Sequence, residues 1–205
     1  MTLYILLATV AVSIGAFQSR QVLDRLIFNP YKVHKQSEWY RFLSSGLIHA
    51  DWMHLLVNMF VLYSFGPVVE QYYADAFGGK AGPYFLVLYA GGLVFSILPT
   101  YRKRLNQPGY NALGASGAVS AIVFSYILFN PLQKLCLYGL LCLPGILFGL
   151  GYVFYSYYMD KKAKDNINHD AHLWGAVYGF VFTILLQPSL LKSFFAQIIF
   201  FRETI

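Results

Sequence analysis

Charged residues are scarce in this sequence. Asp, Glu, Lys and Arg together make up 12% of its 205 residues, about half the share usual in a soluble globular protein. Hydrophobic residues make up 58% and aromatic residues 19% of the chain, and the mean hydropathy is +0.52. Because a soluble fold of this size leaves much of its surface in water, this composition excludes a cytosolic enzyme or a disordered chain. A membrane protein is expected, and its net charge of +6 is attributed to Lys and Arg in loops near lipid headgroups, with no nucleic acid as a partner.

Cysteine is equally rare. The two cysteines, Cys136 and Cys142, both lie in an apolar run that is expected to be helical. Six residues apart on a helix, their side chains point in directions about 120° apart. The sequence therefore predicts two inert buried thiols and no disulfide.

Several motifs of membrane enzymes and transporters are missing. The chain has no His-Glu-x-x-His, and His49 and His54 are spaced five apart, which does not suit two zinc ligands on one helix face. It has no Gly-x-Gly-Asp, which an aspartyl intramembrane protease requires, and no internal repeat of the kind found in secondary transporters. We therefore expect no metal and no cofactor.

Six apolar runs are present, each close to the length that a membrane-spanning helix requires. They predict an all-α, polytopic bundle that forms one domain over 1–205, with a large first loop at 19–51. The tail at 190–205 is too short in its apolar part to span, and an interfacial position for it stays open. The predicted spans are 3–17, 52–73, 83–99, 115–129, 135–158 and 171–186.

Polar residues cluster where the second, fourth and sixth runs begin. With six alternating spans, these three starts open on the same membrane face. They carry His54 and Asn58, then Ser116, then His172. Polar groups inside apolar helices are costly and usually face the bundle interior or a water-filled cavity. A hydroxyl, imidazoles and an amide are the groups used in acyl-transfer hydrolysis.

Each of these features also has a purely structural interpretation. Ser116 could be a small residue that permits close helix packing. His54 and Asn58 share a helix face and could simply join helices by hydrogen bonds. Gly175 and Gly179 form a Gly-x-x-x-Gly packing step. The occurrence of all these sets on one face favours a catalytic site.

The motifs resemble those of the rhomboid intramembrane serine proteases, in the same order and over about Trp39 to Gly179. The resemblance rests on four patterns. They are Gly114-Ala115-Ser116-Gly117, Ala171-His172-x-x-Gly175-x-x-x-Gly179, His54-x-x-x-Asn58 preceded by His49, and Gly66-x-x-x-Glu70.

This resemblance implies a six-transmembrane-helix fold and an endopeptidase that cleaves transmembrane segments of membrane proteins in the lipid bilayer. It implies that Ser116 is the nucleophile and His172 the base of a Ser-His dyad. The oxyanion would be stabilised by the Ser116 backbone amide and by the side chains of His54 and Asn58. Supporting roles are implied for His49, Arg41, Gly114, Gly117, Gly175 and Gly179.

The chain departs from the family pattern at two places. Tyr40-Arg41 stands where the family has Trp-Arg, with Trp39 one residue early. Ser120 occupies the position, one turn after the nucleophile, where an aromatic residue often packs on the base, and Tyr178 and Trp174 are the candidates to replace it.

No acidic residue qualifies as a third member of the catalytic set. Asp170 lies two residues before His172 and would point about 160° away from it on a helix. His169 is nearer in direction, but we expect it to lie in the loop, exposed to solvent. The sequence therefore predicts a dyad.

A non-catalytic rhomboid-like protein that binds membrane clients is the alternative function. Such relatives usually lack the serine or the base, and this chain has both. A transporter or channel is disfavoured, because neither its charged features nor its repeats are present.

The membrane orientation follows from two opposing signals. Eleven of the fifteen Lys and Arg residues lie on the expected catalytic face, which by the positive-inside rule would place that face in the cytoplasm. The resemblance implies the extracytoplasmic side. We favour the latter, since the charges of a folded first loop need not follow the statistics of short loops. The oligomeric state cannot be read from the sequence.

We predict that a fluorophosphonate probe labels Ser116 covalently, because an activated serine attacks phosphorus as it attacks a carbonyl carbon. The measurement is labelling of the purified protein in detergent, followed by peptide mass spectrometry, with Ser116→Ala as the control. A folded wild-type protein that stays unlabelled, or that labels no more than the alanine variant, would contradict the protease interpretation.

Overall fold

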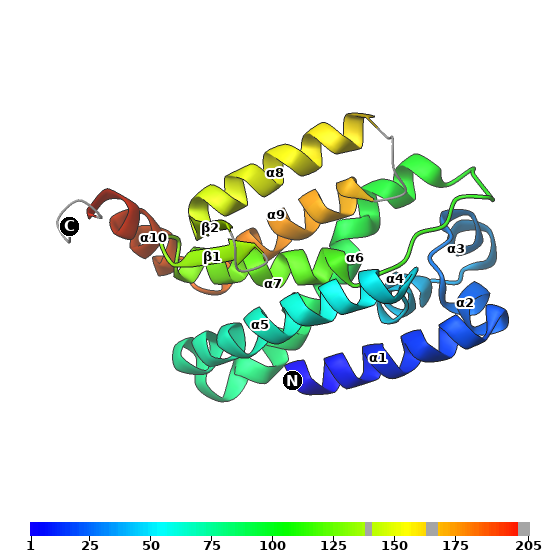
Figure 1. Ribbon diagram of the computed structural model, residues 1–205, viewed down its shortest axis with the longest axis horizontal. Coiled ribbons are helices and arrows are strands. Elements are labelled where there is room, and N and C mark those ends of the chain that lie inside the picture. The colour runs from blue at the N-terminus through cyan, green and yellow to red at the C-terminus, as the bar shows by residue number, and fades with distance from the viewer. Residues whose placement is uncertain (138–140, 163–167, 201–205) are drawn as a thin grey trace.

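The computed structural model describes residues 1–137, 141–162 and 168–200, and these are almost entirely helical (Figure 1). The all-α class is thus confirmed, apart from one two-stranded hairpin. The longer helices are α1 (Thr2–Gln18), α5 (Trp52–Phe77), α6 (Ala81–Arg104), α7 (Ser116–Phe129), α8 (Gly145–Lys162), α9 (His169–Leu186) and α10 (Ser189–Ile199). The shorter elements are α2 (Arg20–Leu26), α3 (Pro30–Gln36), α4 (Arg41–Ser44), the 3-10 turns η1 (Ser45–Leu47) and η2 (Gly78–Lys80), and the strands β1 (Lys134–Leu137) and β2 (Leu141–Pro144).

Side-chain caps determine where two helices of the candidate site begin. The Asp51 carboxylate accepts a hydrogen bond from the His54 amide at the start of α5, at 2.8 Å. The Asn168 side chain accepts one from the Ala171 amide at the start of α9, at 3.2 Å. Such caps satisfy amide groups that have no partner inside the helix. Both helices therefore begin within one turn of a histidine singled out above.

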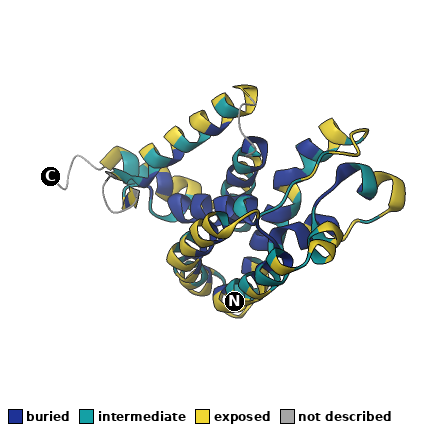
Figure 2. Ribbon diagram, turned by 45° about the vertical axis from the view of Figure 1, so that its right-hand side comes forward, coloured by how far each residue is buried: buried dark blue, intermediate teal, exposed yellow. Residues whose placement is uncertain are grey.

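Helix α7 is the centre of the bundle. Every residue from 117 to 128 is buried, and the helix packs against α5, α6, α8, α9 and α10. Figure 2 shows the buried residues gathered in the middle of the molecule, with exposed positions on the outward faces of the surrounding helices. Many of these outward positions carry large apolar side chains, which fits a lipid environment. They include Leu56, Phe60 and Tyr63 on α5, Leu150 and Phe154 on α8, and Leu185 on α9.

The predicted count of six spans is not confirmed. In the described parts of the chain, one helical stretch is long and apolar enough to cross a membrane alone, Trp52–Arg104, which comprises α5, η2 and α6. A second segment qualifies only if α9 and α10, which are bent by 112° at their junction, count together. Helices α1 and α7 are apolar, with 17 and 14 residues. A helix of 14 residues is about 21 Å long, shorter than the roughly 30 Å hydrocarbon layer.

The prediction for the cysteines was wrong. Cys136 and Cys142 form a disulfide, and they lie opposite each other in the antiparallel pair of β1 and β2. The predicted fifth span at 135–158 is correspondingly wrong at its start, because α8 begins at Gly145. Pro144 at the end of β2 has no amide hydrogen to donate and disfavours helix in the residue before it. The angle calculated for two cysteines on a helix therefore does not apply.

Helices α7 and α9 touch backbone to backbone. A Cβ atom added to Gly175 would lie 2.2 Å from the carbonyl oxygen of Gly117, and one added to Gly179 would lie 2.0 Å from that of Ala121. The two contacts are four residues apart on both helices, so α7 and α9 run parallel at this point. The glycines thus act as packing residues, as one interpretation of the sequence expected.

We predict that Gly179→Ala lowers the melting temperature of the purified protein in detergent, because the new methyl group overlaps the Ala121 carbonyl. Overpacking of this kind costs about 1–3 kcal/mol of unfolding free energy. Gly151→Ala is the matched control, since a Cβ there meets nothing within 4 Å. Equal melting temperatures for the two variants would show that α7 and α9 are not in this contact.

Candidate active site

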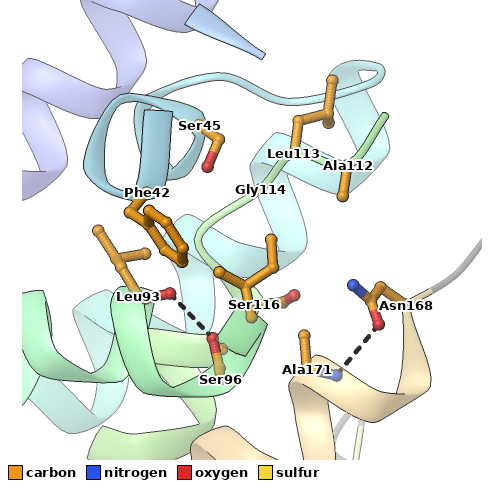
Figure 3. A pocket seen from close by; sticks show the side chains of 12 residues that line it. Phe42, Ser45, Leu93, Ser96, Ala112, Leu113, Gly114, Ser116, Asn168 and Ala171 are labelled. Atoms are coloured by element: carbon orange, nitrogen blue, oxygen red, sulfur yellow. Dashed lines mark hydrogen bonds between the residues drawn. The ribbon is translucent and has the colours of Figure 1, made fainter. Parts of the chain in front are cut away.

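Ser116 lies in a small cavity at one end of the bundle (Figure 3). It is the first residue of α7, so the positive end of that helix dipole points at its surroundings. Figure 3 shows Ser116 between Ser96 of α6 and Ala171 of α9. The cavity of about 30 Å³ is also lined by Phe42, Ser45, Leu93, Ile97, Ala112, Leu113, Gly114, Gly117 and Asn168. Residues of α4, η1, α6, α7 and α9 and of the loop before Ser116 thus meet at this serine.

His172 is placed near the same end by the contact between α7 and α9. The contact joins Gly175 of α9 to Gly117 of α7. His172 lies three residues before Gly175, and Ser116 lies one residue before Gly117. Both helices run the same way from that contact, so the serine and the histidine lie within one turn of it. The structure therefore brings the start of α7 close to the start of α9.

The loop before Ser116 requires a glycine at position 114. Gly114 has a φ angle of +113°, which side chains rarely allow. A Cβ there would lie 2.6 Å from Cε1 of His54, so the imidazole of α5 packs directly over this loop. The Gly114 amide donates to the carbonyl oxygen of Ser45 at 2.9 Å. The loop before Ser116 is thus held by α5 on one side and by the first loop on the other.

His49 also holds the loop before Ser116, by a hydrogen bond to its backbone. Its Nε2 accepts a hydrogen bond from the Ala115 amide at 3.4 Å, and its Nδ1 lies 3.0 Å from the Ser13 hydroxyl of α1. The Ser13 hydroxyl also donates to the Leu47 carbonyl, so the neutral imidazole with its proton on Nδ1 satisfies every bond. Burial lowers the pKa of His49 to about 3, assisted by the nearby His54, which keeps this ring neutral.

Asn58 lies one turn further along α5 than His54. It is buried, and its side-chain amide donates to the His54 carbonyl at 2.9 Å. The amide group carries two hydrogens, so this bond leaves a second one for another acceptor. The rings of His54 and His49 meet edge to face with centroids 4.9 Å apart. His49 and His54 thus lie together beside the loop that precedes Ser116, and Asn58 follows His54 by one turn of α5.

Arg41 fastens the first loop. Its side chain is buried, its Nε forms an ion pair with Glu38, and its Nη1 donates to the carbonyls of Asp24 and Ile27 at 3.0 and 2.6 Å. Positions 19–51 are therefore a folded element that contains α2, α3, α4 and η1. The arginine lies away from the cavity and acts on the site through the loop.

The start of α9 differs from the expectation at His169. This residue is the first of α9 and only 3% exposed, not solvated in a loop. Its ring meets the rings of His172 and Tyr155 edge to face. The Asp170 carboxylate pairs with Lys103 of α6 at 2.8 Å, which draws it to the α6 side. This pairing agrees with the view that Asp170 is not a third catalytic member.

Sequence reasoning missed one aromatic residue that contacts His172. The ring of Tyr152, on α8, stacks on the His172 imidazole with centroids 6.1 Å apart and an angle of 22° between the planes. Of the two candidates from the sequence, Tyr178 donates to the Val87 carbonyl and stacks on Phe95 instead, and Trp174 is exposed. A signal was available, because Ser120 is too small to pack on His172 itself and leaves room for a ring from another helix.

Comparisons with known proteins point to one family. A family model described as "Rhomboid domain" matches residues 36–189. The chain is 32% identical over 149 residues to the "Putative rhomboid protease YdcA" of Bacillus subtilis (strain 168), which covers 72% of this chain and 67% of that protein. It is 29% identical over 163 residues to "Rhomboid-like protein 11, chloroplastic" of Arabidopsis thaliana, covering 77% of this chain and 56% of that protein. It is also 29% identical over 148 residues to "Rhomboid protease GluP" of B. subtilis, of which it covers 25%.

We predict that His49 makes the folded protein sensitive to acid. Its pKa is about 3 in the folded protein against an ordinary value of 6.5, so between these values the unfolded chain binds a proton that the folded chain does not. Stability therefore falls as the pH decreases through this window. The measurement is the difference in melting temperature between pH 7.5 and pH 5.

The matched variants are His49→Gln and His34→Gln, the second at an exposed histidine of α3. His49→Gln should have a lower melting temperature than the wild type at pH 7.5. Its melting temperature should fall less than that of the wild type between pH 7.5 and pH 5. His34→Gln should behave as the wild type. An identical acid-induced loss in all three proteins would contradict the role given to His49.

Proposed function

This chain belongs to the rhomboid family, and on that premise we propose that it is an intramembrane serine endopeptidase with Ser116 and His172 as its catalytic dyad. Membership implies an integral membrane protein. The proposed substrates are transmembrane segments of other membrane proteins. The observation that supports the dyad most directly is the backbone contact of α7 with α9, which places both residues at the same end of two parallel helices.

The proposed reaction begins with attack by the Ser116 hydroxyl oxygen on a substrate carbonyl carbon. His172 takes the hydroxyl proton and returns it to the leaving amine as the carbon–nitrogen bond breaks. Water then attacks the acyl-enzyme, with His172 again as the base, and releases the new carboxyl group and the serine. The protons balance without a metal, a cofactor or a third protein group.

Negative charge develops on the substrate oxygen in both steps. The proposed donors are the Ser116 backbone amide and the side chains of His54 and Asn58, aided by the positive end of the α7 dipole. Three facts support this assignment. His54 packs over Gly114, and Asn58 lies buried one turn away from His54. The amide of Ala115 already donates to His49, so the next amide, that of Ser116, is the proposed donor.

The membrane orientation is a further part of the proposal. We place the site on the extracytoplasmic side, as the family resemblance implies. Two features run against this placement. Ten of the fifteen Lys and Arg residues lie in the folded first loop and at the C-terminal ends of α6 and α8, at the end of the bundle that carries the site. The disulfide joins strands that follow the opposite end of α7, at Phe129. Because disulfides persist in oxidising compartments, the disulfide favours an extracytoplasmic position for the end of the bundle opposite the site. The orientation is therefore measured together with the activity.

We predict a graded loss of activity across the site. Ser116→Ala and His172→Ala should abolish cleavage of a transmembrane reporter in proteoliposomes, because each residue is needed for the covalent step. Asn58→Ala and His54→Ala should each remove one donor and lower kcat by about 10²- to 10³-fold. His49→Ala and Arg41→Ala should mainly lower the melting temperature, since both act through loops. Kcat, KM and melting temperature are measured for every variant.

Two outcomes would contradict this assignment in different ways. Uncleaved reporter with folded wild-type protein that still binds it would favour a non-catalytic client-binding protein. Full kcat in Asn58→Ala and His54→Ala, together with loss of kcat in His49→Ala at an unchanged melting temperature, would move the oxyanion site to another turn of the structure.

A further inference from the structure

Tyr152 joins three helices at the base of the proposed dyad. It belongs to α8, its ring stacks on His172 of α9, and its hydroxyl lies 2.6 Å from the Ser120 hydroxyl of α7. The ring is also packed by Phe148 and Phe124, with centroids 6.3 and 5.8 Å away. A tyrosine held at both its ring and its hydroxyl has little freedom to rotate.

We propose that Tyr152 is the positioning residue of the base, and that Ser120 fixes it in place. This inference rests on the proposed function. A base must be held within about 10–20° of its productive direction, and a stacked ring opposes rotation of the imidazole out of its plane. Centroid separations of 4.5–7 Å are those at which aromatic pairs attract each other.

Ser120 and Tyr152 form a complementary pair. A large residue at position 120 would occupy the space that the tyrosine ring enters, and the serine hydroxyl provides the hydrogen-bond partner that a tyrosine hydroxyl needs away from water. The ring that Ser120 does not provide at His172 is thus provided by Tyr152 of another helix.

The close approach of α8 to α7 makes this contact possible. Gly149 lies three residues before Tyr152, and a Cβ there would be 3.3 Å from the Ile127 side chain and 3.5 Å from the Phe124 ring. Apart from Gly149, the buried residues of α8 are Gly145 and Ser156. Partly buried residues of α8, among them Phe148 and Val153, complete its packing against the core. A displacement of α8 would therefore remove the ring of Tyr152 from His172. Catalytic competence is coupled to the position of α8.

The test compares variants of Tyr152 by two rates. One is the second-order rate of fluorophosphonate labelling at Ser116, which needs the base but no transmembrane substrate. The other is kcat for a transmembrane reporter in proteoliposomes. Tyr152→Leu removes the ring and should lower both rates by about 10- to 100-fold, with KM within about twofold of the wild type. Tyr152→Phe keeps the ring and should restore most of the loss.

Two further variants separate positioning from general damage. Tyr157→Leu changes an exposed tyrosine on the same helix and should leave both rates unchanged. Ser120→Ala should match Tyr152→Phe in both rates, and the double variant should lose no more than either single one, because all three lack the same hydrogen bond.

The outcomes distinguish this inference from the proposed function. If the wild type neither labels nor cleaves, the protease proposal fails. If the wild type is active and Tyr152→Leu has the same labelling rate and kcat, the positioning role is wrong and the protease proposal stands. If Tyr152→Leu does not fold, Tyr152→Met, which also lacks the ring, takes its place, and rates equal to those of Tyr152→Phe would overturn the inference.

Discussion

The direct contact between the α7 and α9 backbones is the constraint on which the rest of the site depends. Because Gly175 and Gly179 have no side chains, the two helices approach until their backbones touch at Gly117 and Ala121. This contact determines both the distance and the register between the helix starts. Ser116 and His172 need no further element to bring them to one end of the bundle. The same close packing thus joins the two helices and brings Ser116 and His172 to one end of the bundle.

Around this contact, the polar residues of the site are supported by elements that lie outside the long helices. The loop before Ser116 bends through a positive φ angle at Gly114 and is held by His49 from one side and Ser45 from another. Arg41 in turn holds the first loop together through backbone carbonyls. A buried polar group with a partner costs far less than one without. The first loop therefore contributes to the site by satisfying hydrogen bonds that apolar helices cannot provide.

Helix α8 has a different relation to the site. It follows the disulfide-bonded hairpin, buries few of its own residues, and turns apolar side chains such as Phe154 outward. It nevertheless supplies the ring that stacks on His172. The proposed nucleophile is thus attached to a helix whose residues 117 to 128 are all buried, whereas the proposed base is stacked by a helix with few buried residues. In the proposed enzyme, the position of the base would therefore respond to whatever contacts α8.

The sequence by itself determined the membrane class, the all-α fold and the family, because these depend on composition and on local motifs. The spacing of His172, Gly175 and Gly179 along one helix, and the glycines flanking Ser116, also belong to local sequence, so the candidate residues could be named in advance. Only the tertiary structure decided what depends on distant segments meeting. Cys136 and Cys142 pair across a hairpin, where the apolar run had predicted a helix. His169 is buried, and the ring of Tyr152 from α8 stacks on His172 beside Ser120. Helical periodicity describes neighbours on one helix, whereas a stacking partner from another helix is selected by packing, which no spacing along the chain records.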